Sequence, residues 1–234
     1  MEKENKIVNC KICKEKNKEK NIIKCFYCGH IFRNYPLINL ENFYSNVYRK
    51  IKDNTALSPE TYEKRNKFII NKIKQFIFNK KKIFEVGFGY GYFYRTLLEE
   101  LPDLEYCCCE ISTPLSIENN ERGIKTFNSS FQDIKGEKFD VIVSFDVLEH
   151  FYDPNEYKVK LLDLLDVDGI AVIQVPTDRK IHFRKPFDGH YHYFSEKSLK
   201  LLLGEEFECL MFYKTNPGET AGGKEFLTAF RRIK

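Results

Sequence analysis

From residue 81 onwards the chain alternates short apolar runs with segments whose apolar residues recur at helical intervals. The apolar runs, such as residues 139–144, are of strand length and are bounded by polar or turn-forming residues, which favours buried strands. The predicted strands are residues 83–86, 104–111, 124–127, 139–144, 170–175, 207–213 and 226–233. The predicted helices are residues 92–101, a segment opening at Thr113-Pro114, residues 157–165 closed by Gly169, and residues 195–203.

Strands and helices that alternate in this way are typical of an α/β fold, in which a mostly parallel, doubly wound sheet carries helices on both faces. The pattern therefore predicts a seven-stranded sheet. Its last two strands follow one another without an intervening helix, which predicts an antiparallel hairpin at one edge.

The sequence before residue 81 does not show this alternation of strands and helices. Ser58-Pro59-Glu60 has the N-cap, first-position proline and first-turn acid of a helix, which the apolar pattern continues to about Phe78. We predict three parts: a small zinc ribbon over residues 1–34, a connector and helix over 35–80 in the position of a lid, and a catalytic α/β domain over 81–234.

Composition narrows the possible partners. A formal net charge of +4 is too mild to predict nucleic-acid binding. No apolar stretch reaches the roughly 20 residues that a membrane span requires. Met1 is followed by Glu-Lys-Glu-Asn, which does not resemble the apolar core of a signal peptide. We therefore expect a cytoplasmic protein with no membrane partner.

The eight cysteines fall into two groups. Cys107, Cys108, Cys109 and Cys209 lie in apolar runs and are predicted to fill the core. The others form two pairs, each with two residues between its members: Cys10, Cys13, Cys25 and Cys28. Four thiolates complete a tetrahedral zinc shell with no position left for water, so we predict a structural Zn²⁺. His30 is not required as a ligand, and we predict it at the surface.

A glycine loop follows the first strand of the α/β region. Residues 83–93 read Ile-Phe-Glu-Val-Gly-Phe-Gly-Tyr-Gly-Tyr-Phe, with Gly87, Gly89 and Gly91 where the strand turns into a helix. Glycine accepts positive φ there and lets a ligand approach the backbone beside the helix N-terminus. Glu110 ends the next strand, where a carboxylate can accept both hydroxyls of a ribose. The equal two-residue spacing differs from the dinucleotide fingerprint, whose last two glycines are three apart.

Glu85 stands two residues before the first glycine, inside a predicted buried strand where a carboxylate needs a partner. This arrangement resembles the first motif of class I S-adenosylmethionine-dependent methyltransferases, with Glu in place of the commoner Asp. Residues 139–154 resemble the fourth-strand motif of that family, and residues 189–195 resemble the segment after its fifth strand. The resemblance covers residues 81 to about 205. It implies a Rossmann-like methyltransferase fold, with S-adenosylmethionine as donor and S-adenosylhomocysteine as product.

The resemblance also implies roles for single residues. Asp133 matches the acid that meets the adenine amino group, and the segment around Phe145 and Asp146 matches the sulfonium end. The cysteine module, then Phe43-Tyr44 and Tyr48, then the α/β domain are similar in order to a subgroup that methylates sugars and other small metabolites. That similarity implies a connector folded over the donor. The implied cofactor-binding residues are Glu85, Gly87, Gly89, Gly91, Glu110, Asp133 and Phe145.

A neutral hydroxyl acceptor benefits from a general base, and histidine suits that task near neutral pH. The catalytic candidates are His150, His190 and His192. His150 follows the fourth strand at the carboxyl edge of the sheet, where a role in starting the next helix explains it equally well. His190 and His192 alternate and are expected on one side. They are open to binding a metal, steering an anionic acceptor or packing the loop, and the metal is least supported because no third ligand is evident. Arg184 and Lys185 are candidates for an acceptor phosphate or carboxylate.

We therefore predict a methyltransferase that acts on a small molecule, with O-methylation of a sugar or phosphorylated metabolite as the leading hypothesis. Two alternatives stay open: a nucleic-acid or protein methyltransferase that docks its substrate through the zinc module, and a non-catalytic, zinc-stabilised binding subunit. The intact set of glycines and acids argues against the second. Residues 145–148 read Phe-Asp-Val-Leu and lack an Asn/Asp-Pro-Pro-aromatic tetrad, which argues against amino-methylation of bases.

Overall fold

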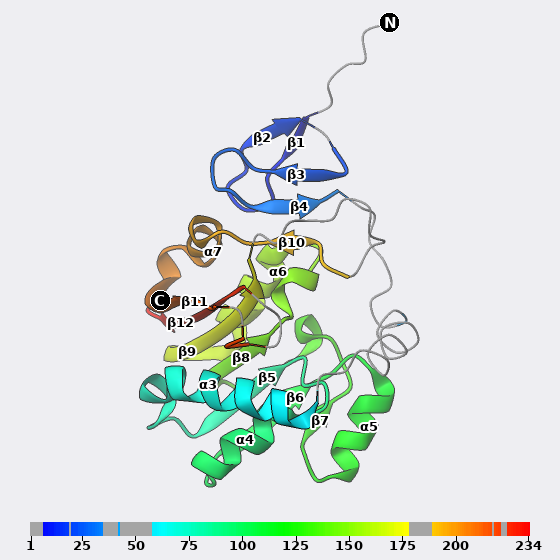
Figure 1. Ribbon diagram of the computed structural model, residues 1–234, viewed down its shortest axis with the longest axis vertical. Coiled ribbons are helices and arrows are strands. Elements are labelled where there is room, and N and C mark those ends of the chain that lie inside the picture. Colours follow the sequence, from blue (N-terminus) through cyan, green and yellow to red (C-terminus); the bar gives the residue numbers. More distant parts are fainter. Residues whose placement is uncertain are drawn as a thin grey trace, which may run out of the picture.

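The computed structural model describes residues 7–18, 20–34, 42, 58–177, 189–216, 218–220 and 224–234. Its centre is a seven-stranded sheet whose spatial order is β11 (Phe207–Lys214), β12 (Glu225–Arg232), β9 (Leu165–Pro176), β8 (Phe139–Phe145), β5 (Lys82–Val86), β6 (Glu105–Cys109) and β7 (Thr126–Phe127) (Figure 1). Neighbours from β9 to β7 are parallel, whereas β12 is antiparallel to both β9 and β11. The predicted mostly parallel sheet and its edge hairpin are confirmed.

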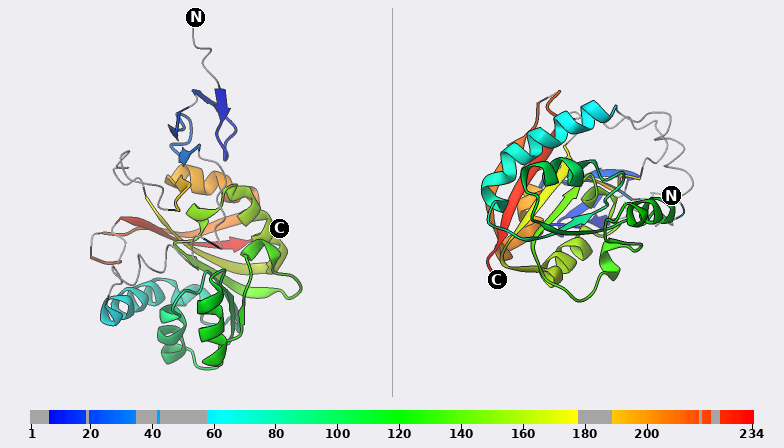
Figure 2. Two further views of the ribbon diagram at one scale, coloured as in Figure 1. Left: turned by 90° about the vertical axis from the view of Figure 1, so that its right-hand side faces the viewer. Right: turned by 90° about the horizontal axis from the view of Figure 1, so that it is seen from below.

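Helices cover both faces of this sheet, as the two views of Figure 2 show. They are α3 (Pro59–Ile77), α4 (Tyr92–Glu100), α5 (Thr113–Glu121), α6 (Pro154–Leu164) and α7 (Glu196–Leu203). Along β8, Val141 and Val143 pack in one core with α3 and α4, while Ile142 packs in the other with α6 and α7. Because both faces of the strand are buried, its centre, residues 141–143, is a continuous apolar run.

Local signals set most helix starts. The Ser58 side chain accepts the N–H of Thr61, Pro59 takes the first position, and α3 ends at Ile77, close to the predicted end. The prediction that Gly169 closes the helix before β9 was wrong. α6 ends at Leu164, and the chain enters β9 at once because buried Leu165 already pairs with Phe139 of β8.

The first 34 residues contribute two hairpins: β1 (Ile7–Asn9) with β2 (Lys16–Lys18), and β3 (Ile22–Lys24) with β4 (Ile31–Arg33). β4 also pairs with β10 (His192–Tyr193), so a segment of the α/β region completes a three-stranded sheet with the N-terminal module (Figure 1). The module is therefore joined to the α/β region by backbone hydrogen bonds.

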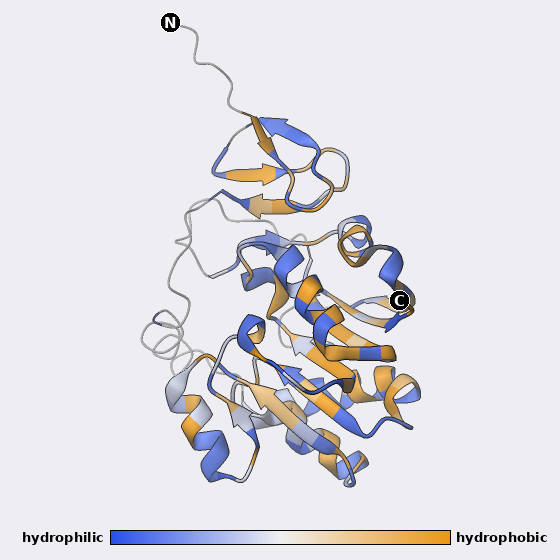
Figure 3. Cartoon of the chain, turned by 180° about the vertical axis from the view of Figure 1, so that it is seen from behind, coloured by the Kyte–Doolittle hydropathy of each residue, from blue (hydrophilic) through white to orange (hydrophobic). Residues whose placement is uncertain are grey.

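Apolar residues concentrate in the central strands, while the helices alternate between apolar and polar faces (Figure 3). Cys107, Cys108 and Cys109 are buried as predicted. The prediction for Cys209 was wrong, since this cysteine is exposed on the edge strand β11. Among the described helices, none combines the length and apolarity needed to cross a bilayer. Phe43-Tyr44, Tyr48, Arg184 and Lys185 lie outside the described residues.

Candidate active site

The loop between β5 and α4 contains three left-handed glycines. Gly87 and Gly91 have φ values of +72° and +69°. A Cβ on Gly87 would stand 2.7 Å from Val147 Cγ2, and one on Gly91 would stand 2.5 Å from the Phe88 ring. Gly89 has φ +55°, yet a Cβ there would meet nothing within 4 Å. The backbone of Gly89 therefore borders open space that a ligand can enter beside the N-terminus of α4.

Glu110 lies directly after β6 and faces this loop. Its Oε2 accepts the N–H of Gly89 at 2.9 Å, and its Oε1 accepts the N–H of Ser112 at 2.8 Å. Burial raises the pKa of Glu110, while the two backbone N–H groups lower it. The carboxylate is thus fixed at the carboxyl edge of the sheet, with lone pairs left to accept hydroxyls of a ligand.

Glu85 in β5 has its partner on the neighbouring strand. The hydroxyl of Tyr106 in β6 donates to Glu85 Oε2. Burial nevertheless raises the pKa of Glu85 to about 8, although the Tyr106 hydrogen bond and the positive charge of Arg65 act in the opposite direction. A cationic ligand group next to this carboxylate would favour its ionised form.

These groups border one cavity of about 750 Å³, a size typical of small-molecule sites. Asp133 lines it from the 3₁₀ turn η2 (Phe131–Asp133), and its Oδ2 accepts the hydroxyl of Ser130 at 2.5 Å. Arg65 of α3 donates to Asp146 Oδ2 at 3.2 Å on the same wall. All the predicted cofactor-binding residues line the cavity: Glu85, Gly87, Gly89, Gly91, Glu110, Asp133 and Phe145.

Two of the three candidate histidines lie together. His150, in the 3₁₀ turn η3 (Leu148–His150), lines the cavity, and the ring of His190 lies edge-on to it with centroids 4.7 Å apart. His150 Nδ1 is 2.8 Å from the carbonyl oxygen of Gly189. A carbonyl only accepts, so Nδ1 carries the proton and Nε2 of the neutral ring presents its lone pair. Buried Glu149 stands beside it, with Oε1 4.0 Å from His150 Nε2.

His192 contacts the N-terminal module instead, and does not line this cavity. Its Nε2 donates to the carbonyl of Phe151 at 2.7 Å, and its Nδ1 lies 3.1 Å from Nε2 of His30. Burial lowers the pKa of His192 to about 3, so its neutral Nδ1 accepts the His30 N–H. The prediction that His30 is a surface residue was wrong: it is fully buried because β4 and β10 pair around it.

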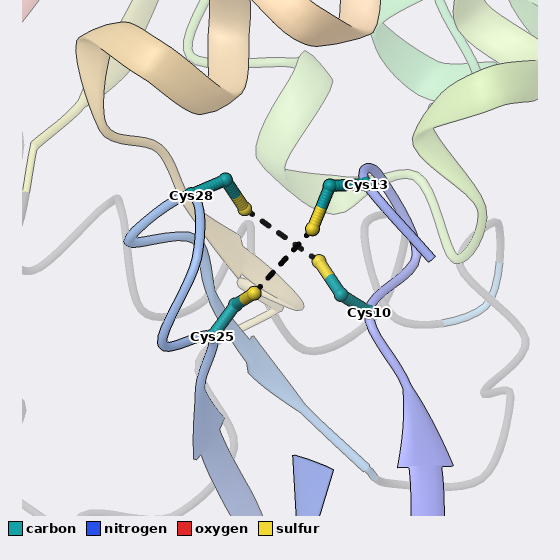
Figure 4. Close-up of side chains that lie close together, drawn as sticks. All are labelled: Cys10, Cys13, Cys25 and Cys28. Atoms are coloured by element: carbon teal, nitrogen blue, oxygen red, sulfur yellow. Dashed lines mark hydrogen bonds between the residues drawn. The ribbon is translucent and has the colours of Figure 1, made fainter. Parts of the chain in front are cut away.

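The four paired cysteines converge from two turns of the module, as Figure 4 shows. The Sγ atoms of Cys10 and Cys28 are 3.7 Å apart, and those of Cys13 and Cys25 are 3.5 Å apart. Zinc–sulfur bonds of about 2.3 Å in a tetrahedron place sulfur atoms about 3.8 Å apart, so the cluster fits one zinc ion. The metal itself remains a proposal.

The module also reaches the cavity wall. The Lys11 ammonium, between the first two cysteines, lies 3.5 Å from the centroid of the Tyr152 ring and donates to the Tyr152 carbonyl at 2.5 Å. The Asn155 amide donates to the Lys11 carbonyl at 2.9 Å. Because Tyr152 lines the cavity, the cysteine module supports the same wall as His150.

A family model described as a methyltransferase domain matches residues 60–208, which is more than half of the chain. The protein therefore belongs to this methyltransferase-domain family. The match begins at the first turn of α3 and runs through the glycine loop, the cavity and the histidine pair. Among curated proteins, none matches the chain.

Several solved structures share the fold. An S-adenosylmethionine-dependent methyltransferase from Clostridium acetobutylicum is 11% identical, covers 84% of this chain and 100% of its own, and has a TM-score of 0.59. The 1,6-didemethyltoxoflavin-N1-methyltransferase of Burkholderia thailandensis, with bound S-adenosylhomocysteine, is 15% identical over 92% of this chain and 100% of its own, with a TM-score of 0.61. The magnesium protoporphyrin IX methyltransferase of Synechocystis PCC 6803 is 13% identical over 82% and 98%, with a TM-score of 0.63. These likenesses establish the Rossmann-like methyltransferase fold.

Three site residues were not found from the sequence. Arg65 donates to Asp146 and Tyr106 donates to Glu85, from elements whose patterns show only a helix and a strand. Glu149 lies in the segment that resembles the fourth-strand motif, and the resemblance gives it no role of its own. The signal in the sequence is the adjacent pair Glu149-His150 shortly after a strand, at the carboxyl edge where ligands bind.

Proposed function

We propose that this protein is an S-adenosylmethionine-dependent methyltransferase that methylates a small molecule. The observation that carries the proposal is the pairing of Glu110 with the Gly89 backbone in the wall of the cavity. A fixed carboxylate can accept the hydroxyls of a ribose, and the open glycine loop beside it leaves room for the rest of the ligand that is attached to that ribose. The neighbours with bound S-adenosylhomocysteine support this choice through their shared fold.

Different residues of the cavity are assigned to different parts of the donor. We assign the ribose hydroxyls to Glu110, the adenine amino group to Asp133 and the cationic end of the donor to the wall formed by Glu85 and Phe145. S-adenosylmethionine supplies a methyl group that is already activated on a positively charged sulfur. The protein's task is then to hold the acceptor in line with that methyl group and to exclude water.

We assign the acceptor to His150 and His190, because His150 lines the cavity with Asp146 and Tyr152 and the ring of His190 packs against His150. We favour O-methylation of a sugar or phosphorylated metabolite, since a hydroxyl needs help in losing its proton and this histidine pair can supply it. We further propose that the cysteine module holds one structural zinc ion and that the connector closes over the donor.

The donor assignment is tested by binding of S-adenosylhomocysteine, measured by calorimetry and thermal stabilisation. Glu110→Ala should weaken binding by roughly 10- to 100-fold, because charge-assisted hydrogen bonds of about 1.5–3 kcal/mol are lost. Glu100→Ala, at the exposed end of α4, is the control. No stabilisation of the wild type at saturating ligand would refute the assignment.

The acceptor class is tested with labelled S-adenosylmethionine and a panel of sugars, sugar phosphates, small peptides and nucleic acids. We expect label to appear in a sugar or sugar phosphate. Transfer to nucleic acid or protein would favour the docking alternative instead, and donor binding without transfer to any acceptor would favour the binding subunit.

A further inference from the structure

Three side chains beside the cavity have the composition of a metal site: Glu149, His150 and His190. One ligand atom from each, a carboxylate oxygen or an imidazole nitrogen, lies within 4.8 Å of the other two. Ligands bound to one ion at about 2.0–2.2 Å lie about 3.4 Å apart in a tetrahedron, so side-chain shifts of about 1 Å would bring all three onto it.

His150 is already oriented as a ligand. Its Nδ1–H donates to the Gly189 carbonyl, which leaves the Nε2 lone pair on the side of Glu149. Metal-binding histidines almost always donate their other ring N–H to a carbonyl or carboxylate in this way, because the bond fixes the tautomer and the ring orientation.

The backbone holds the three residues together. The N–H of Tyr191 donates to the Glu149 carbonyl at 2.8 Å, which ties the segment of His190 to the turn that carries the other two ligands. The side chain of Glu149 is 0% exposed and that of His150 is 12% exposed. A divalent ion bound here would place a positive charge beside this buried carboxylate.

We propose that Glu149, His150 and His190 bind a divalent first-row metal ion, zinc foremost, at the wall of the donor cavity. Two imidazoles and one carboxylate form the ligand set of catalytic zinc sites, which leave a coordination position open. This site is chemically unlike the cysteine cluster, in which four sulfur atoms leave no open position.

The role of the ion rests on the proposed function. A Lewis acid at this wall lowers the pKa of an acceptor hydroxyl, whose proton passes to water. The acceptor oxygen then forms the bond to the methyl carbon while the carbon–sulfur bond breaks, and sulfur keeps that electron pair. Under this proposal His150 and His190 act as ligands and not as a free general base.

The experiment measures metal content in the full chain. Protein dialysed against a slight excess of Zn²⁺ and then against metal-free buffer should retain two zinc ions by mass spectrometry, one for each cluster. His190→Ala and Glu149→Gln should each retain one, and titration should show the second zinc weakened by at least roughly 10- to 100-fold. Glu100→Gln, a matched change at an exposed position, should retain two.

Binding of S-adenosylhomocysteine separates this inference from the proposed function and also reports folding of the variants. His190→Ala is the safer variant, because His190 precedes β10 and lies outside every described helix and strand. A wild type that binds the ligand but retains one zinc, or an unchanged zinc count in His190→Ala, overturns the metal site and leaves the donor assignment intact. Two zinc ions without ligand binding would sustain the metal site and refute the donor assignment.

Discussion

Nε2 of His30 donates to Nδ1 of His192 across 3.1 Å, and the far nitrogen of His192 donates to the carbonyl of Phe151. The two rings therefore form a hydrogen-bonded path from the cysteine module to the residue that follows His150. The other ring nitrogen of His30, Nδ1, lies 3.6 Å from Cys10 Sγ, so the pair of rings adjoins the cysteine cluster. Hydrogen bonds through both rings thus connect the module to Phe151 in the wall of the cavity.

We expect His30→Ala to lower the free energy of unfolding by about 1–3 kcal/mol, because it leaves the buried Nδ1 of His192 without its donor. Chemical denaturation in the presence of zinc measures the change. Phe26→Ala, at a residue that is 99% exposed on the same module, should change stability by less than about 0.5 kcal/mol. Equal effects of the two substitutions would contradict the buried pair.

Loss of the cysteine cluster should weaken ligand binding in the donor cavity. Cys25→Ser combined with Cys28→Ser should remove one bound zinc and weaken S-adenosylhomocysteine binding by roughly tenfold, about 1.4 kcal/mol. The reason is that Lys11 would no longer hold the Tyr152 carbonyl in place, and His192 would no longer hold the Phe151 carbonyl. Metal analysis and calorimetry on the same sample check both parts. Wild-type affinity in the zinc-free variant would show that the module is independent of the site.

The three loop glycines should separate folding from binding. Gly89→Ala should lower the free energy of unfolding by about 1–2 kcal/mol, because the residue has a left-handed backbone. It should also weaken S-adenosylhomocysteine binding, because its new Cβ enters the cavity. Gly87→Ala should lose more stability, since it adds a 2.7 Å contact with Val147. Thermal unfolding and calorimetry distinguish the two variants. Unchanged binding by Gly89→Ala would show that the ligand does not touch this backbone.

Glu85 should make stability depend on pH. Its pKa is about 8 in the folded chain and 4.5 ordinarily, so between these values the folded state holds a proton that the unfolded state has released. The free energy of unfolding should therefore fall as the pH rises from about 4.5 to about 8. Glu85→Gln should flatten this slope and raise stability at pH 9 by a few kcal/mol, since each tenfold change in proton affinity is worth about 1.4 kcal/mol.

Ionisation of Glu85 should have the opposite effect on the affinity for the donor, which should increase with pH. The sulfonium and amino groups of the donor are cationic, and they favour ionised Glu85. Affinity for S-adenosylmethionine should rise as the pH approaches 8, the value at which Glu85 loses its proton without ligand. Calorimetry across this range checks the slope, and Glu85→Gln should abolish it. A slope that persists in Glu85→Gln would assign the titration to another group.

Much of the fold followed from periodicity because central strands such as β5 and β8 are buried on both faces, and helices such as α3 bury one face. The loop residues of the site followed too, since Gly87, Gly89, Gly91 and Glu110 occupy fixed places at strand ends. Such positions depend on a few neighbouring residues, which a sequence contains in full.

What could not be predicted depends on contacts between distant segments. His30 is buried by a strand that includes His192, and Cys209 is exposed because β11 lies at the edge of the sheet. The Tyr106–Glu85 hydrogen bond depends on which strands are neighbours and in what register. Glu149 gained a role only when the turn after β8 met the segment of His190.

The pairing of β4 with β10 has a consequence for synthesis. Phe32 is opposite His192, so the module leaves the ribosome long before its last strand exists. At about 5–20 residues per second, the open edge of β4 waits roughly 10–30 s for its partner. During that interval an unpaired strand edge is a site for wrong association. Zinc binding by the cysteines would then keep the module folded in the nascent chain, although the edge of β4 stays exposed until β10 has been synthesised.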